Sequence, residues 1–130
     1  MTDMNSADSS RQETVLRFRD GSTERLTGVL SIDREEQVVS VEAGDSPRPI
    51  PFSSLKAVFF LRSGTESALE PPEGGITLSV EFDDGEVIRG VSPDYSPQRS
   101  GFFLVPFDRS KTDSIFVVNS AIVSIEIEKF

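Results

Sequence analysis

The residues best suited to recognise a ligand lie in one stretch of the second half of the chain, SPDYSPQRSGFFLVP, residues 92–106. Pro93 and Pro97 stiffen this stretch, and an aromatic ring and an arginine on a rigid loop are frequent contacts in protein interfaces. The candidate ligand- or partner-binding set is Arg89, Asp94, Tyr95, Arg99 and Phe102. The alternative is a structural connection whose apolar end, GFFL, fills the core.

Catalysis and metal binding have little support in the residue types present. The chain has 130 residues and contains no cysteine or histidine, so zinc sites of the Cys/His kind and Cys-His or Ser-His nucleophiles are excluded. Asp83, Asp84 and Glu86 surround one turn, but they lack the ligand number and order of a calcium-binding EF-hand loop. We therefore expect no catalytic residues, no metal and no cofactor, and we predict that this acidic turn is a solvated hairpin tip.

The charge balance bears on the choice of partner. The net charge is −9 and the predicted pI is about 4.4. Residues 1–65 hold eight basic and ten acidic side chains, and residues 66–130 hold five and twelve, so the acidity lies mainly in the second half. Because an acidic surface repels phosphate backbones, we expect a protein partner and no nucleic acid. No secretory signal or membrane-spanning run is present, which predicts a cytoplasmic protein without membrane insertion.

The hydrophobic pattern predicts an almost entirely β chain. Short alternating apolar runs bounded by Gly, Pro, Asp and Ser are typical of strands. Residues 1–13 are rich in Ser and Asp and predict a disordered tail, and residues 63–75 read as a linker between residues 14–62 and 76–130. FSSLKAVFFL, residues 52–61, favours a strand buried on both faces over a short helix.

The same turn occurs twice. VEFDDGEVIRG, residues 80–90, has a looser copy in LRFRDGSTERLTG, residues 16–28, at an offset of 64. Ser53-Ser54 also matches Asn119-Ser120, at an offset of 66. We interpret the chain as a tandem duplication and predict a type I′ turn at Asp84-Gly85. A chance likeness stays open, because β-proteins share a small vocabulary of turns.

The second copy resembles the Sm-like fold of the Hfq type. In that fold a strand, an Asn/Asp-Gly turn and a second glycine open a small barrel, and Gly85 and Gly90 have this spacing. The resemblance implies two tandem Sm-like or SH3-like barrels, each a duplicated five-stranded unit. It also predicts that Gly90 lets a bent strand pass close to its neighbour. Hfq-type proteins bind uridine beside a Lys-His pair in the closing turn, and neither Ser53-Ser54 nor Asn119-Ser120 carries a cation.

Two further resemblances concern the candidate loop. DYSPQRSG is similar to the Asp/Asn-x-Ser-x-x-Gly turn by which PilZ domains bind cyclic di-GMP. Asp94 and Ser96 fit it, Gly101 comes two residues late, and no Arg-x-x-x-Arg precedes it. The element YSPQRSGFFLVP is also similar to bacterial domains with a YSPxxxGFFLxP pattern, a group that implies no particular activity.

Together these observations favour a non-catalytic protein-interaction or regulatory module of a bacterial cytosolic assembly. The alternative is nucleotide or RNA binding at the Arg-bearing loop, in an Hfq-like or PilZ-like manner. The last predicted strand, Ala121 to Phe130, alternates isoleucine with Glu126 and Glu128, which look like protection of a sheet edge. We therefore expect a monomer or a closed homodimer in place of a hexameric ring.

Overall fold

The computed structural model describes residues 13–61, 75–108 and 110–128, and these residues form an all-β protein, as predicted. Most of the predicted tail and linker lies outside the described residues. The elements, in chain order, are β1 (Thr14–Phe18), β2 (Thr23–Leu26), β3 (Val29–Asp33), β4 (Val38–Ala43), β5 (Ser46–Pro51), the 3₁₀ turn η1 (Phe52–Ser54), β6 (Leu55–Leu61), β7 (Ile76–Phe82), β8 (Val87–Ser92), β9 (Gly101–Pro106), β10 (Thr112–Val118), the 3₁₀ turn η2 (Asn119–Ala121) and β11 (Ile122–Glu128).

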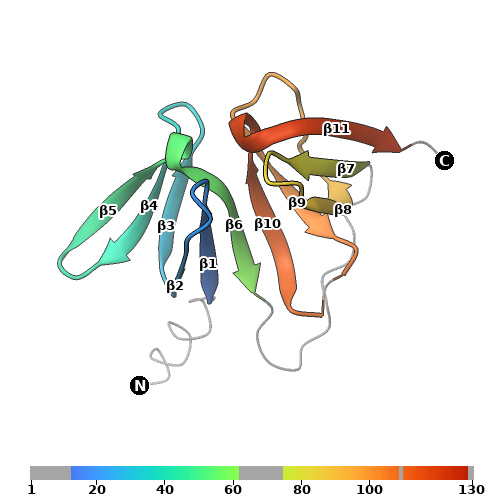
Figure 1. The fold of residues 1–130 in the computed structure, drawn as a ribbon. Helices are drawn as coiled ribbons and strands as arrows, with labels where there is room; N and C mark the ends of the chain where they lie inside the picture. Colours follow the sequence, from blue (N-terminus) through green and yellow to red (C-terminus); the bar gives the residue numbers. More distant parts are fainter. Residues whose placement is uncertain (1–12, 62–74, 109, 129–130) are drawn as a thin grey trace.

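The strands form two sheets (Figure 1). One has eight strands in the order β11-β7-β8-β9-β10-β6-β1-β2, and the other has three in the order β3-β4-β5. Only two residues, Thr27 and Gly28, separate β2 from β3, so the chain passes from one sheet to the other at a bend. The end strands of each sheet do not pair with one another, so neither sheet closes into a barrel.

The two halves of the chain pair their strands in a similar order. The exception is that β8 of the second half pairs with both β7 and β9, whereas β2 and β3 divide this role in the first half and lie in different sheets. In residues 14–61, β1 pairs with β2 and β6, and β4 pairs with β3 and β5. In residues 76–128, β7 pairs with β8 and β11, and β9 pairs with β8 and β10. In each half a 3₁₀ turn precedes the last strand. The last strand of each half therefore lies beside the first strand of the same half.

Equivalent residues of these last strands, identified by their pairing partners, are 67 positions apart in the sequence, a distance called the structural offset below. Phe18 is opposite Leu55 and Phe82 is opposite Ile122, and in both pairs a bulge follows. The predicted match of Ser53-Ser54 with Asn119-Ser120, at an offset of 66, is therefore wrong by one residue. Similar polar side chains do not fix the equivalence of the two turns, because the register is set by backbone pairing.

The two tight hairpins have the same geometry. In the second, the N–H of Gly85 donates to the carbonyl of Phe82 and the N–H of Phe82 donates to that of Glu86, both at 2.9 Å. Gly85 has φ 93° and Gly21, in the first hairpin, has φ 94°. A type I′ turn needs a positive φ at both central residues, and Asp84 does not have one. The predicted type I′ turn is wrong: a glycine in the left-handed region closes each hairpin after an ordinary turn.

Gly90 is a point of close approach between β8 and β9, as predicted. A Cβ atom built on Gly90 would lie 2.3 Å from the carbonyl oxygen of Val105. Because that contact is with backbone, a side chain at this position would separate the strands.

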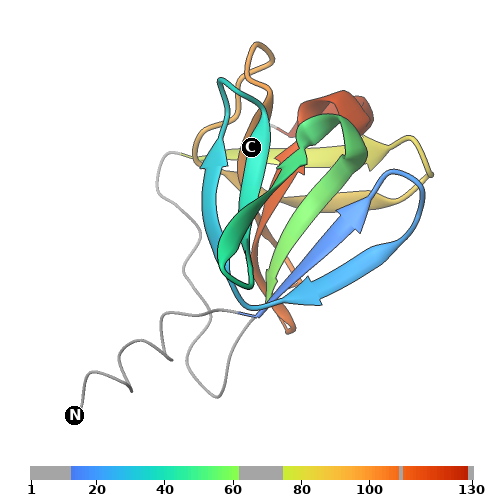
Figure 2. The same cartoon turned by 90° about the vertical axis from the view of Figure 1, so that its left-hand side faces the viewer.

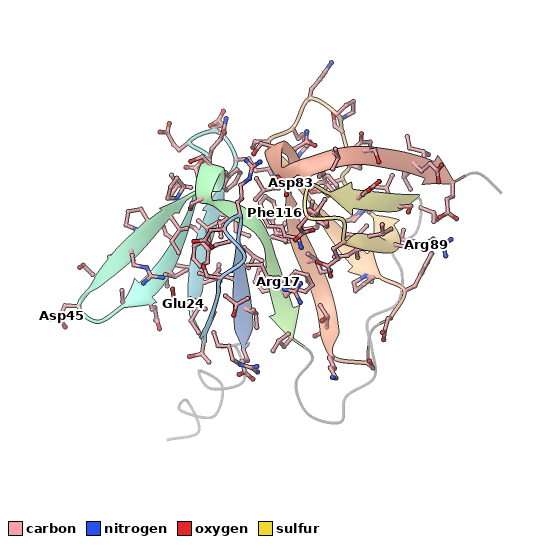
Figure 3. All side chains as sticks on the ribbon, viewed as in Figure 1. Arg17, Glu24, Asp45, Asp83, Arg89 and Phe116 are labelled. Carbon is pink, nitrogen blue, oxygen red and sulfur yellow. The ribbon has the colours of Figure 1, made fainter. Side chains whose placement is uncertain are left out.

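The antiparallel pair of β6 and β10 joins the two halves. Each of these strands supplies side chains to two hydrophobic clusters, one per half. Phe59 and Ile115 belong to the cluster of the second half, whereas Val58 and Phe116 belong to that of the first. Figure 3 places Phe116 at the centre of the molecule, between the halves. The prediction that residues 52–61 contain a strand buried on both faces is confirmed.

Candidate functional site

The loop between β8 and β9 packs against the turn between β3 and β4 in the first half. The Asp94 carboxylate forms an ion pair with Arg34, and their side chains are 23% and 26% exposed. Asp94 also accepts a 2.9 Å hydrogen bond from the N–H of Phe103, and Ser100 Oγ donates to the Arg34 carbonyl at 2.8 Å. Asp94 therefore holds the two halves together.

Tyr95 and Phe102 belong to the packed interior. Phe102 is fully buried, and Tyr95 is partly buried with its ring edge-on to Phe102 at a centroid distance of 5.0 Å. A buried ring is not accessible to a partner, so Phe102 acts here through packing.

The two arginines of the candidate set lie apart from these residues. Arg89, at the far end of the second half in Figure 3, donates two hydrogen bonds to Glu128, at 2.7 and 2.9 Å, and lies over the Phe107 ring. Arg99 is exposed at the loop tip, where its carbonyl accepts from Asn119 Nδ2 at 2.9 Å. The structure does not bring the five predicted residues together into one ligand-binding surface.

The acidic hairpin turn of the second half is exposed to solvent, as predicted, with the Asp83 and Asp84 side chains 49% and 52% exposed, and it also contacts the first half. Three ion pairs join Asp83 to Arg19 at 3.1 Å, Glu86 to Arg17 at 3.1 Å and Asp84 to Lys56 at 2.7 Å. The turns of both hairpins lie side by side in Figure 2. No group of acidic residues suited to a metal ion occurs within the described parts of the chain.

Lys56 is the buried member of this network. Its side chain is 6% exposed, its ammonium also pairs with Glu86, and it lies 4.8 Å from the centroid of the Phe82 ring. The hydrogen bond from Lys56 lowers the pKa of Asp84 below its ordinary value of 3.8, and a backbone bond from Glu86 adds to this effect. The sequence gives no sign of the network, because its members come from both halves.

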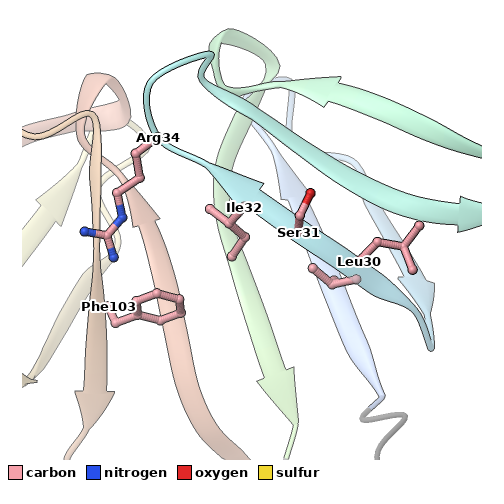
Figure 4. A pocket seen from close by; sticks show the side chains of 6 residues that line it. Leu30, Ser31, Ile32, Arg34 and Phe103 are labelled. Carbon is pink, nitrogen blue, oxygen red and sulfur yellow. The ribbon is translucent and has the colours of Figure 1, made fainter.

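A shallow apolar groove lies beside the contact between Arg34 and Phe103 (Figure 4). Its volume is about 330 Å³. Leu30, at one end, is 50% exposed, and the Arg34 guanidinium lies 5.5 Å from the Phe103 ring centroid at the other. The lining residues are Val29, Leu30, Ser31, Ile32, Arg34 and Phe103. The groove carries one cation, already paired with Asp94, and so offers little to a phosphate group.

The outer edge of β11 is a further candidate surface, which the sequence indicated only as a protected sheet edge. It is an end strand, and its exposed side chains include Val123 and Ile127, which are 62% and 51% accessible. β6 occupies the same place in the first half, and there the corresponding edge is covered by β10.

The hydrogen bonds of β7 indicate which backbone groups of β11 point outward. The N–H of Phe82 donates toward β8, and that of Asp83 donates to the Ala121 carbonyl, at the start of β11. The backbone N–H and C=O groups of successive residues point to opposite sides of a strand, so the odd-numbered residues of β7 form hydrogen bonds with β11. Their partners Ser124, Glu126 and Glu128 face inward. The backbone N–H and C=O groups that face outward belong to Ile125 and Ile127.

The β5 edge at the other end of the three-stranded sheet differs chemically. The N–H of Phe52 donates to the Gln37 carbonyl, so alternate residues of β5, counting back from Phe52, bond to β4. The residues that face outward are Pro47, Pro49 and Pro51. Proline has no N–H, so this edge offers carbonyl acceptors and no donors.

Comparison with known proteins identifies a family but no activity. Residues 10–129 match the model of DUF6982, a family of unknown function. The chain belongs to the DUF6982 family. No curated protein and no solved structure matches it. The described residues include no helix that could cross a membrane.

Proposed function

We propose that this protein is a non-catalytic protein-interaction module of a bacterial cytosolic assembly, and that it binds its partner by strand addition to the outer edge of β11. We also propose that its halves are tandem Sm-like units that share the β6–β10 pair. The observation that carries the first proposal is the open edge of β11, whose counterpart in the first half already holds an antiparallel strand.

The equivalence of the two edges can be followed residue by residue. The N–H of Leu61 donates to the Glu13 carbonyl on the β1 side, so by alternation Val58 and Phe60 face β10. At the structural offset of 67, these residues correspond to Ile125 and Ile127. An added strand on β11 would therefore find outward-facing backbone groups where β10 finds them on β6.

The prolines of β5 support a partner other than a second copy joined head to tail. The N–H of Asn119 donates to the Ser100 carbonyl, so Phe116 and Ser114 of β10 face β6. Their counterparts in β5 are Pro49 and Pro47. Suppose that β5 of one molecule paired with β11 of the next. Each pair of a β5 proline with a β11 isoleucine would then lack one of its two backbone hydrogen bonds, because proline has no N–H. This loss opposes assembly of the protein into a ring or filament.

Selection from a displayed library of random extended peptides tests this proposal. The full chain is the bait, and an Ile127→Pro variant, which lacks one outward N–H, is used for counter-selection. Ile127→Ala, which keeps the N–H, is the matched control. We expect peptides that bind the wild type and the alanine variant and bind the proline variant at least about 10-fold more weakly. Peptides that bind all three equally, or no enrichment, would refute binding at the β11 edge.

A further inference from the structure

We propose that the segment that adds to β11 is an extended strand of another protein in which apolar and basic residues alternate. This inference rests on the proposed function and names the chemistry of the partner. It follows from what each face of β11 presents beside the open edge.

One face of the edge is apolar. Ile125 is opposite Val80 and Ile127 is opposite Leu78, and both of these β7 residues are fully buried. Ile125 packs against the core cluster, whereas Ile127 is half exposed, and none of the described strands pairs with β11 on its outer side. Directly opposite residues in antiparallel strands share a face. The incoming residues whose backbone bonds to Ile125 and Ile127 are therefore expected to be apolar.

The other face is acidic. Glu126 and Glu81 are both exposed on it, and Ser124 Oγ donates to Glu81 Oε1 at 3.3 Å. Glu128, on the same face, is already paired with Arg89. Among the described residues no cation forms an ion pair with Glu126 or Glu81. The incoming residues that lie over these two carboxylates are therefore expected to be basic.

The same charges oppose pairing of β11 with β11 of a second copy. An antiparallel pair centred on Ile125 would place Glu126 of each copy diagonally across from its equivalent, while each Glu126 is also diagonally next to Glu81 of its own chain. Each chain also carries a net charge of −9. Like charges on neighbouring strands are destabilising, whereas a basic strand would be attracted to this face.

The test uses short synthetic peptides with the full-length protein, and the measured quantity is the dissociation constant. The first peptide alternates valine and lysine. The controls are valine alternating with glutamate, valine alternating with threonine, and a peptide with the same valines and lysines in two blocks. We expect the alternating Val/Lys peptide to bind at least about 10-fold more tightly than each control. The block control separates strand pairing from attraction between opposite net charges.

Two sets of variants locate the binding. N-methylation of the valines, whose N–H groups would face β11, should abolish binding, and N-methylation of the lysines should preserve it. In the protein, Glu126→Gln should weaken binding about threefold and Glu126→Lys about 10-fold, and Glu126→Lys should shift the preference toward the Val/Glu peptide.

The outcomes separate this inference from the proposed function. Equal binding of the Val/Thr and Val/Lys peptides, with dependence on the valine N–H, would overturn the basic partner and leave strand addition standing. Equal binding of the block and alternating peptides would also overturn the inference of a partner in which apolar and basic residues alternate. A stable dimer of the free protein that Ile127→Pro dissociates would show instead that the edge binds a second copy.

Discussion

The last strands of the two halves, β6 and β11, occupy the same place in the pairing order and have different surroundings. Both follow a 3₁₀ turn, both pair with the first strand of their half, and both have a bulge one residue after the first pair. β6 supplies buried side chains to a hydrophobic cluster on each face and pairs with β10 along its outer edge, whereas β11 ends the sheet. Strands with the same place in the pairing order thus differ in their outer edges: that of β6 is covered by a described strand, and that of β11 is not.

The two tight hairpins differ in the sign of their charges. In each, the aspartate before the turn glycine accepts a hydrogen bond from the backbone N–H two residues on. The first hairpin carries Arg17 and Arg19, which pair with Glu86 and Asp83 of the second. Both hairpins therefore help to hold the halves together.

The largest effect is expected at Phe116, where the halves share a core. Its ring is fully buried and packs against Phe52 and Phe103 at centroid distances of 5.4 and 5.2 Å. Phe116→Ala should lower the free energy of unfolding by about 4 kcal/mol, measured by urea denaturation. Val123→Ala on the open edge is the control and should change it by less than about 0.5 kcal/mol. Similar losses in the two variants would contradict the contrast between the buried β6–β10 pair and the open edge of β11.

Tyr95 and Arg99 separate the packed part of the β8–β9 loop from its exposed part. Tyr95→Ala removes the edge-on contact with the buried Phe102 and should cost about 2 kcal/mol of stability. Arg99→Ala should cost less than about 0.5 kcal/mol, because that side chain is exposed. Thermal melts of both variants test this. An unchanged melting temperature for Tyr95→Ala would restore the loop as a candidate binding surface.

Lys56 tests how far the acidic hairpin joins the halves. Lys56→Met keeps most of the side-chain volume but leaves Asp84 and Glu86 without their buried cation. We expect a loss of about 1–2 kcal/mol in urea denaturation, below the 3–5 kcal/mol typical of breaking a fully buried pair, because both carboxylates reach solvent. A more stable variant would indicate that the cost of burying the ammonium exceeds the attraction.

The smallest expected effect is the pH dependence of the same contact. The pKa of Asp84 lies below its ordinary value of 3.8 in the folded protein, because Lys56 donates to the charged form. The contact between Asp84 and Lys56 therefore adds to the free energy of unfolding above about pH 4. This stabilisation is lost as the pH falls through the pKa of Asp84 in the folded protein. Urea denaturation between pH 5 and pH 2 should show less pH dependence in Lys56→Met than in the wild type.

Asp20 and Asp108 provide an internal control for that comparison. Their pKa values are also lowered, mainly by hydrogen bonds from the hydroxyls of Ser22 and Ser110. Both bonds are local and remain in Lys56→Met, so the difference between the two proteins reports the contacts that Lys56 makes with the acidic turn. Equal pH dependence in both would exclude those contacts as its source.

The amino-acid sequence alone was enough to predict the all-β class of the fold and its two tight hairpins. Alternating apolar residues and the two Asp-Gly turns predicted an all-β chain and matching hairpins, since both follow from local periodicity and from the conformational freedom of glycine. The continuous apolar run in residues 52–61 predicted a strand buried on both faces, which is β6.

Tertiary structure alone decided how the halves meet and which residues are available to a partner. Asp94 and Tyr95 looked like binding residues, but Asp94 pairs with Arg34, 60 residues away, and Tyr95 packs on Phe102. The exposed acidic turn also pairs with Lys56, a contact between the two halves. Local pattern cannot predict such contacts, because they form between strands whose order in the sheet depends on the whole chain. For the same reason, only the order of strands in the sheets shows that β11 and β5 are end strands. The outward-facing residues of β5 are prolines, so that edge has no outward N–H donor.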